Sequence, residues 1–260
     1  MDQLRFEEGV RYAERNCRDT GWHLWLDKRY FQQNLSLDGM DILDFGCGMG
    51  GMSMWCATHW DCQVLGVDID ANHLAVAERV KEIHQVTNAT FERRDVIDNP
   101  LEDRTFDLII LNDVVEHISL PLLQKILNEL ARRLRPNGKL FVSYPPWEGP
   151  YASHLNHMIK LPWCQFMPHR WLHRRIEEKN YSMVGEKDIK EEYFSLNHLT
   201  HARLKPMLRA AGLVIRDRKS HTLVNRLPGL QRVNFNVFPF NFLVTKELLL
   251  LNRGDDADQE

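Results

Sequence analysis

The chain has 260 residues, of which 43% are hydrophobic and 27% charged, and these proportions are typical of a globular protein with one large core. Its net charge of -3 provides no overall basic field, so we expect no nucleic-acid partner. The five cysteines form no C-x-x-C pair, the N-terminus has no signal-peptide pattern, and no apolar run reaches the ~20 residues that span a bilayer. We therefore expect a cytoplasmic protein with reduced thiols and no membrane insertion.

Alternating strands and helices follow a helical N-terminal segment. Residues 2–34 have apolar and aromatic positions at helical spacing, which predicts helices. The following part of the pattern predicts strands at 40–45, 62–68, 89–95, 106–112 and 139–145, and helices at 52–60, 71–85 and 120–134. The third of these strands is the most polar, which favours a place nearer the sheet edge. Residues 135–138 (RPNG) predict a turn that ends the third helix. Right-handed crossovers and a mostly parallel sheet should result.

The alternation stops after residue 145. Residues 145–195 contain no clean strand pattern, but they are too apolar for a solvated loop of this length. We interpret residues 146–196 as a lid, which either adds core or covers an acceptor pocket. A helix is predicted at 197–212, and strands at 213–221 and 240–251 could form an antiparallel edge. The expected divisions of this single domain are an N-terminal helical cap (1–38), a cofactor-binding core (39–145), the lid (146–196), a C-terminal helix and hairpin (197–252) and a tail (253–260).

A glycine-rich turn, DFGCGMGG at residues 44–51, follows the first of these strands and opens a helix. Glycines allow close approach of the backbone to a ligand, and the helix N-terminus offers free N–H groups. A nucleotide-like cofactor should bind there, at the carboxyl ends of the strands. Gly46, Gly48 and Gly51 also satisfy the dinucleotide pattern, which is weak by itself. However, Asp44 would repel a pyrophosphate and attract an ammonium group, and no Tyr-x-x-x-Lys pair occurs.

Five motifs occur in order along the chain: DFGCGMG, GVDID, RRDV, FDLIILNDVVEHI and RPNGKLFVS. With them the sequence resembles the class I S-adenosylmethionine-dependent methyltransferases, particularly the small-molecule group similar to the enzymes of ubiquinone and menaquinone biosynthesis. The resemblance covers residues 38–145 well and the last two strands in outline. It implies S-adenosyl-L-methionine as the cofactor. The implied fold is an α/β fold whose seven-stranded, mostly parallel sheet has an antiparallel C-terminal strand, helices on both faces and a lid insertion after the fifth strand.

The resemblance also implies a set of cofactor-binding residues: Asp44, Gly46, Cys47, Gly48, Gly50, Asp68, Ile69, Asp95, Val96, Asn112 and Asp113. The residues of the glycine turn would line the methionine moiety. Asp68 would hold the ribose, and Ile69 would pack on the adenine. Asp95 would meet the adenine amino group with Val96 beside it, although a helix-cap role for this aspartate is an open alternative. Asn112 would present its carbonyl to the methionine ammonium.

Three histidines are the candidate catalytic residues: His117, His154 and His157. Methylation of an alcohol or phenol requires removal of a proton, usually by His, Asp or Glu, and each of these histidines would act as the base or position the acceptor. Asp113, Glu116 and His117 fall on nearly one face if a helical turn follows the fourth strand. Some relatives use such a Glu/His set with a divalent ion, and one of the other two histidines could complete it. We expect no metal, because histidine clusters without closed ligand spacing are more often structural.

The segment Tyr144-Pro145-Pro146-Trp147 resembles the catalytic loop of enzymes that methylate nucleobase amino groups. That loop follows the fourth strand, whereas this segment ends the fifth, so we exclude this function. We expect a methyltransferase that acts on a small, partly apolar acceptor, most simply at oxygen. The alternatives are N- or C-methylation, metal-assisted transfer that uses Glu116 and His117, an NAD(P)-dependent oxidoreductase, and a non-catalytic cofactor-binding partner protein. A homodimer is left open.

Overall fold

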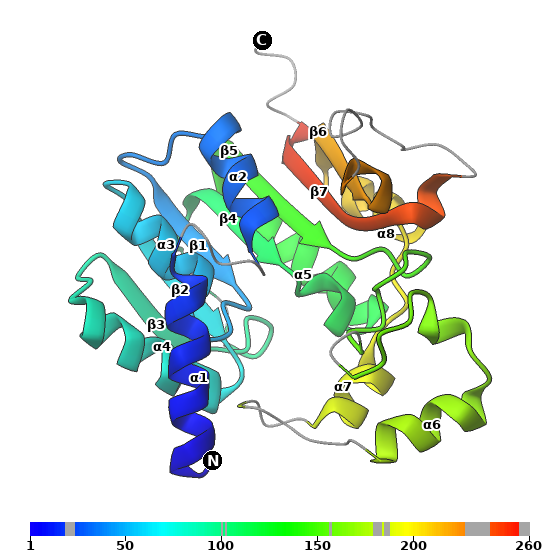
Figure 1. Cartoon of the computed structure of the whole chain (residues 1–260). Coiled ribbons are helices and arrows are strands. Elements are labelled where there is room, and N and C mark those ends of the chain that lie inside the picture. Colours follow the sequence, from blue (N-terminus) through cyan, green and yellow to red (C-terminus); the bar gives the residue numbers. More distant parts are fainter. Residues whose placement is uncertain are drawn as a thin grey trace.

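A seven-stranded sheet forms the centre of the protein, with the strand order β3-β2-β1-β4-β5-β7-β6 (Figure 1). The structure is a computed structural model that describes residues 1–18, 24–99, 101, 103–155, 158–178, 184, 188–226 and 240–254. The parallel strands are β1 (Asp41–Phe45), β2 (Gln63–Asp68), β3 (Ala89–Arg93), β4 (Phe106–Asn112) and β5 (Leu134–Tyr144). β7 (Val244–Arg253) pairs antiparallel with both β5 and β6 (Leu213–Thr222). The predicted sheet is therefore confirmed, with the polar strand β3 at one edge.

Helices cover both faces of the sheet. They are α1 (Gln3–Asn16), α2 (Trp25–Asn34), α3 (Gly51–His59), α4 (Ala71–His84), α5 (Leu120–Arg133) and α8 (His201–Ala210). Side chains of a strand point alternately to its two faces, and β4 shows this directly. Leu108 and Ile110 pack with residues of α2, α3 and α4, whereas Ile109 and Leu111 pack with residues of α5 and α8. Each such buried side chain contributes about 1.5–3 kcal/mol, so β4 is anchored on both sides and holds its carboxyl end in place.

The N-terminal segment forms two helices, as predicted. The Phe31 ring of α2 meets Phe141 of β5 edge to face, with ring centroids 4.6 Å apart. This contact anchors α2 on the sheet beside the central strands. Residues 19–23, among them Trp22 and His23, lie outside the described residues.

The lid has a small hydrophobic core of its own. It contains η2 (Cys164–Phe166), α6 (His169–Glu178) and α7 (Ile189–Ser195). Ile159 and Leu172 are buried in this core, together with Tyr193 of α7. Other apolar lid side chains, among them Leu161 and Phe166, remain exposed. Only some of the apolar residues of the lid are therefore buried as additional core.

Three predicted boundaries were wrong. The RPNG turn lies inside β5, because Leu134 already pairs with Phe106 and the pairing resumes at Lys139 after an irregularity. α8 begins at residue 201 and not at 197, because the Thr200 side chain caps it. β7 begins at residue 244, after a short 3-10 turn, η4 (Phe240–Leu243). Within the described part of the chain, no helix is long and apolar enough to cross a membrane.

Candidate cofactor and acceptor site

The glycine turn between β1 and α3 has the left-handed backbone that glycine adopts easily. Gly46 has φ +70°, and a Cβ atom there would lie 2.6 Å from a methyl group of Val114, so close packing also requires glycine. Gly48 has φ +53°, and a Cβ atom there would meet no atom of the described residues within 4 Å. The turn is thus packed on one side against the segment that follows β4 and open on the other, where a ligand could approach the backbone.

Asp68, at the carboxyl end of β2, holds this turn in place. Its Oδ2 accepts a hydrogen bond of 2.8 Å from the Gly48 N–H, and its Oδ1 accepts one of 2.8 Å from the Asp70 N–H. The next residue, Ile69, is 62% exposed although it is large and apolar. The roles of Asp68 toward a ribose and of Ile69 toward an adenine ring stay predictions, with which this carboxylate and this uncovered apolar side chain are compatible.

Asp44 is buried at the carboxyl end of β1, below the same turn. Its Oδ2 accepts a hydrogen bond of 2.5 Å from the Ser53 hydroxyl of α3. Burial raises the pKa of the Asp44 carboxyl to about 6, although the hydrogen bonds from Ser53 work in the opposite direction. A cation bound nearby would favour the ionised form of this group, as expected for a site that receives an ammonium.

The segment after β3 places its two predicted residues differently. Asp95 is exposed, and its Oδ1 accepts a hydrogen bond of 3.0 Å from the Ile97 N–H. Val96 is buried in the core cluster of the α5 face. The aspartate is therefore accessible to a ligand, whereas the valine side chain supports the loop from below.

At the end of β4, Asn112 and Asp113 have separate partners. The Asn112 amide nitrogen donates a 2.6 Å hydrogen bond to the Ser143 hydroxyl on β5, so the amide oxygen is not the atom used in this contact. Asp113 has φ +52°, and its Oδ2 lies 2.7 Å from Nζ of Lys246, which also lies 2.7 Å from Oδ2 of Asp27 on α2. We predicted Asp113 as a cofactor residue, and the structure places its carboxylate in an ion network that joins β4, β7 and α2.

Sequence reasoning missed Lys246 and Asp27. Two neighbouring charged residues, Lys246 and Glu247, interrupt an otherwise apolar run. A buried strand that carries charges must provide partners for them, and this was the available signal.

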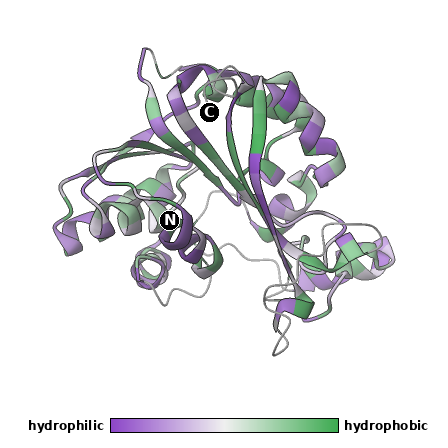
Figure 2. Ribbon diagram, turned by 90° about the horizontal axis from the view of Figure 1, so that it is seen from above, coloured by the Kyte–Doolittle hydropathy of each residue, from purple (hydrophilic) through white to green (hydrophobic). Residues whose placement is uncertain are grey.

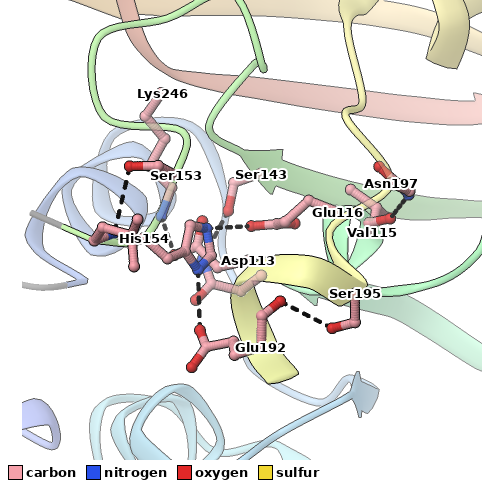
Figure 3. A network of polar contacts seen from close by, with 12 residues as sticks. Asp113, Val115, Glu116, Ser143, Ser153, His154, Glu192, Ser195, Asn197 and Lys246 are labelled. Carbon is pink, nitrogen blue, oxygen red and sulfur yellow. Dashed lines mark hydrogen bonds and ion pairs between the residues drawn. The ribbon is translucent and has the colours of Figure 1, made fainter. Parts of the chain in front are cut away.

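Two predicted histidines, His117 and His154, meet beyond the carboxyl end of β4. Figure 3 shows His154 with the two carboxylates next to it, those of Glu116 and Glu192. The short helix η1 (Val115–His117) carries Glu116 and His117, and the lid supplies His154. Nε2 of His154 lies 3.4 Å from Oε1 of Glu116, its Nδ1 lies 3.3 Å from Oε1 of Glu192, and the two histidine rings are 4.8 Å apart. Glu192 on α7 was not predicted, and only the fold brings it here. His157 lies outside the described residues.

The environments of the two histidines differ in charge. Burial lowers the pKa of His117, and the neighbouring Glu116 only partly opposes this effect. Burial would also lower the pKa of His154, but its pairing with Glu116 and Glu192 outweighs burial and raises that pKa to about 10. At neutral pH His117 is therefore neutral and able to accept a proton, whereas His154 is a cation.

The same cluster has the composition of a metal site. Donor atoms of Glu116, His117 and His154 all lie within 4.8 Å of one another. Both carboxylate oxygens of Glu116 are buried and have no hydrogen-bond partner among the described residues, and Oε1 forms the ion pair with His154. Two imidazoles and one carboxylate are ligands that suit zinc and other transition-metal ions, so these residues fit a divalent cation.

Comparison with known proteins identifies the domain. The family model described as "Methyltransferase domain" matches residues 42–138. The chain is 32% identical over 115 residues to a ubiquinone biosynthesis O-methyltransferase of Coxiella burnetii, which covers 44% of this chain and 47% of that protein. It is 28% identical over 143 residues to the chloroplastic tocopherol O-methyltransferase of Arabidopsis thaliana, with 47% and 39% covered. The chain thus spans less than half the length of these relatives.

Solved structures share the fold of this protein over nearly its whole length. An S-adenosylmethionine-dependent methyltransferase from Clostridium acetobutylicum superposes with a TM-score of 0.57 over 90% of this chain and 91% of that one, at 15% identity. At this identity the match supports the fold only. Together with the motif order, these similarities identify the domain as a methyltransferase domain rather than the core of a nicotinamide oxidoreductase.

Proposed function

We propose that this chain, which carries a class I S-adenosylmethionine-dependent methyltransferase domain, transfers a methyl group to a hydroxyl oxygen of a small, partly apolar acceptor. The observation that carries the proposal is His117. It is a partly buried imidazole with a lowered pKa, and it follows the strand whose end packs against the glycine turn. A neutral base at this place is what removal of a hydroxyl proton requires.

The carboxyl edge of β1, β2 and β4 would hold the cofactor, which supplies a methyl group on a sulfonium. Gly48 would let the backbone approach the methionine part, next to Cys47 in the same turn. Asp68 would accept hydrogen bonds from the ribose hydroxyls, because backbone N–H groups already fix the orientation of its carboxylate. Ile69 would pack on the adenine. Asp44 would balance the charge of the ammonium group.

In the transfer step, the acceptor oxygen attacks the methyl carbon, a C–O bond forms and the C–S bond breaks. The hydroxyl proton passes to His117. His154 is protonated and paired with Glu116 and Glu192, so its role is to hold the lid and the η1 segment together around the acceptor and not to take the proton. Positioning supplies much of the rate in such a displacement, which makes this lid contact important.

Oxygen as the attacked atom is supported by the basic imidazole and by the O-methyltransferase activity named for both curated relatives above. A partly apolar acceptor is supported by the apolar and aromatic residues of the lid.

Two measurements test the proposal. Calorimetry with S-adenosylmethionine should show binding that Asp68→Ala weakens about tenfold or more, the cost of one lost charge-assisted contact. Transfer of a labelled methyl group to hydroxylated acceptors should then fall about 10²–10⁴-fold in His117→Asn, with cofactor binding unchanged. Absence of binding heat would refute the cofactor assignment. Full turnover in His117→Asn would refute the base assignment only.

A second candidate is metal-assisted transfer, favoured by the Glu116 carboxylate of the Glu116–His117–His154 cluster, whose buried oxygens have no hydrogen-bond partner among the described residues. These three residues would hold a divalent cation, which supplies a Lewis acid next to the acceptor. Elemental analysis of the purified protein and activity after strong chelation distinguish the two candidates. Full activity of a chelated, metal-free enzyme would exclude the metal-assisted form.

A further inference from the structure

Large apolar side chains are exposed together on two segments that are far apart in the sequence. One segment is the part of the lid around η2, and the other is η4, directly before β7. Five of these side chains are between 41% and 59% exposed: Leu161, Phe166, Met167, Phe240 and Phe242. Single exposed apolar residues are ordinary, but a contiguous group marks a surface that meets something else.

Trp163 joins the two segments. Its indole N–H donates a hydrogen bond of 3.2 Å to the Phe242 carbonyl, and the two ring centroids lie 6.0 Å apart. Trp163 itself has φ +56°, a left-handed backbone that is costly for a large side chain. Trp163, Phe166 and Phe242, together with Glu148, line an open depression of about 440 Å³. We call Trp163 and the five exposed side chains the aromatic patch.

The aromatic patch lies at the same edge of the sheet as the candidate site. β5 and β7 are antiparallel, and Tyr144 at the carboxyl end of β5 pairs with Glu247 near the start of β7. The chain that enters β7 therefore comes from beyond the carboxyl edge, where the glycine turn and His117 lie. Trp147, just past β5, lies 6.5 Å from the Phe166 ring. Viewed from above, the start of β7 and the lid lie side by side, beyond the ends of the parallel strands (Figure 2).

Both segments come from parts of the sequence that lack acidic residues. Residues 149–176 and 218–246 contain Lys and Arg but no Asp or Glu, in a chain with 36 acidic residues and a net charge of -3. Lys160 and Arg170 flank the apolar side chains of the lid and are exposed. Of the described residues that line the depression, Glu148 alone is acidic, and burial raises the pKa of its carboxyl, which weakens its repulsion of anions. The surroundings of the patch thus favour a negatively charged partner.

We propose that the aromatic patch binds the surface of a lipid bilayer that contains anionic lipids. Aromatic and aliphatic side chains would enter the boundary between headgroups and acyl chains, and the flanking cations would face the headgroups. An indole with its N–H fixed is suited to this boundary, because one part of the ring is apolar and the other polar. The chain would lie on the membrane and not across it. If the proposed function holds, this orientation would bring a membrane-dissolved acceptor to the carboxyl edge of the sheet.

The experiment is flotation of the purified chain with vesicles of phosphatidylcholine alone, or of equal parts of phosphatidylcholine and phosphatidylglycerol. We expect binding to the anionic vesicles that falls with added salt. Phe166→Ser and Phe242→Ser, on separate segments, should each weaken binding about tenfold. Lys160→Glu should weaken it for the anionic vesicles. Ile83→Ser is the matched control, because Ile83 is 42% exposed but lies on α4, outside the patch.

Three results would overturn the proposal: no binding to either vesicle, equal binding by the patch variants and the control, or self-association in light scattering that the patch variants abolish while vesicles bind nothing. The last result would make the patch an interface between two copies of the chain. Folding of each variant is checked by its circular dichroism and cofactor calorimetry. Vesicle binding requires neither cofactor nor turnover, so its outcome is independent of the proposed methyl transfer.

Discussion

Lys246 gives the sharpest test of how the N-terminal cap is attached to the sheet. Its ammonium lies 2.7 Å from a carboxylate oxygen of Asp27 on α2 and 2.7 Å from one of Asp113 after β4, and Asp27 is 0% exposed. Lys246→Met removes the cation and leaves Asp27 buried and charged without this partner. Loss of one member of a buried ion set costs about 3–5 kcal/mol. We expect the free energy of unfolding to fall by that amount.

Urea unfolding followed by circular dichroism measures this loss. The triple variant Lys246→Met, Asp27→Asn, Asp113→Asn should recover much of it, because no uncompensated charge remains. Arg174→Ala is the matched control, since the Arg174 side chain is 81% exposed and pairs with Glu178 on the protein surface. It should cost less than about 1 kcal/mol. A loss below about 1 kcal/mol for Lys246→Met would show that the network does not hold the cap, and would refute the reasoning.

Three further predictions concern the site. Gly46→Ala should lower the free energy of unfolding by about 1–3 kcal/mol, because the residue has φ +70° and its Cβ would lie 2.6 Å from Val114; urea unfolding checks this, and a neutral substitution would contradict it. The acidic limb of kcat/KM should lie below pH 6.5, because the proposed base, His117, has a lowered pKa. A limb above pH 6.5 would show that another group is the base. The folded-state pKa of His154 is raised to about 10, so its stabilising effect is complete below pH ~6.5 and is lost as the pH rises through about 10. Thermal unfolding at pH 6, 8 and 10 should therefore show a decline that His154→Gln lacks.

The core of the fold could be predicted because its information is local. Each strand from β1 to β5 is an apolar run bounded by turn residues, and each intervening helix has its own pattern. The glycine turn and Asp68 follow strand ends directly, so the parallel sheet places them at one edge without further information. The boundaries that were wrong are those where tertiary contacts decide. Leu134 joins β5 before the turn because Phe106 is opposite it, which no local pattern shows.

The contacts that complete the site could not be predicted, because their members are far apart in the sequence. Asp27 and Lys246 are separated by most of the chain, and His154 and Glu192 belong to a lid with no regular pattern. Sequence does show that a charge in an apolar strand needs a partner, but it does not show which one. From the sequence alone, His117 and His154 were equally good candidates for the catalytic base. Only the environment of each assigns them opposite protonation states, because burial dominates for His117 and pairing with two carboxylates dominates for His154.

The lid shows how much of the burial of a segment can be predicted from its amino-acid composition. Its apolar content required that the side chains be covered, and the structure covers only part of them, through the small core around Leu172 and Ile176. The covered residues come from α6 and its neighbours, whereas Phe166, which ends η2, and Met167, which follows it, are exposed. A protein that needed only more core would have no reason to hold Trp163 in a left-handed backbone beside exposed rings. On the two proposals made above, the inner side of the lid holds His154 at the acceptor site, and its outer side meets the bilayer.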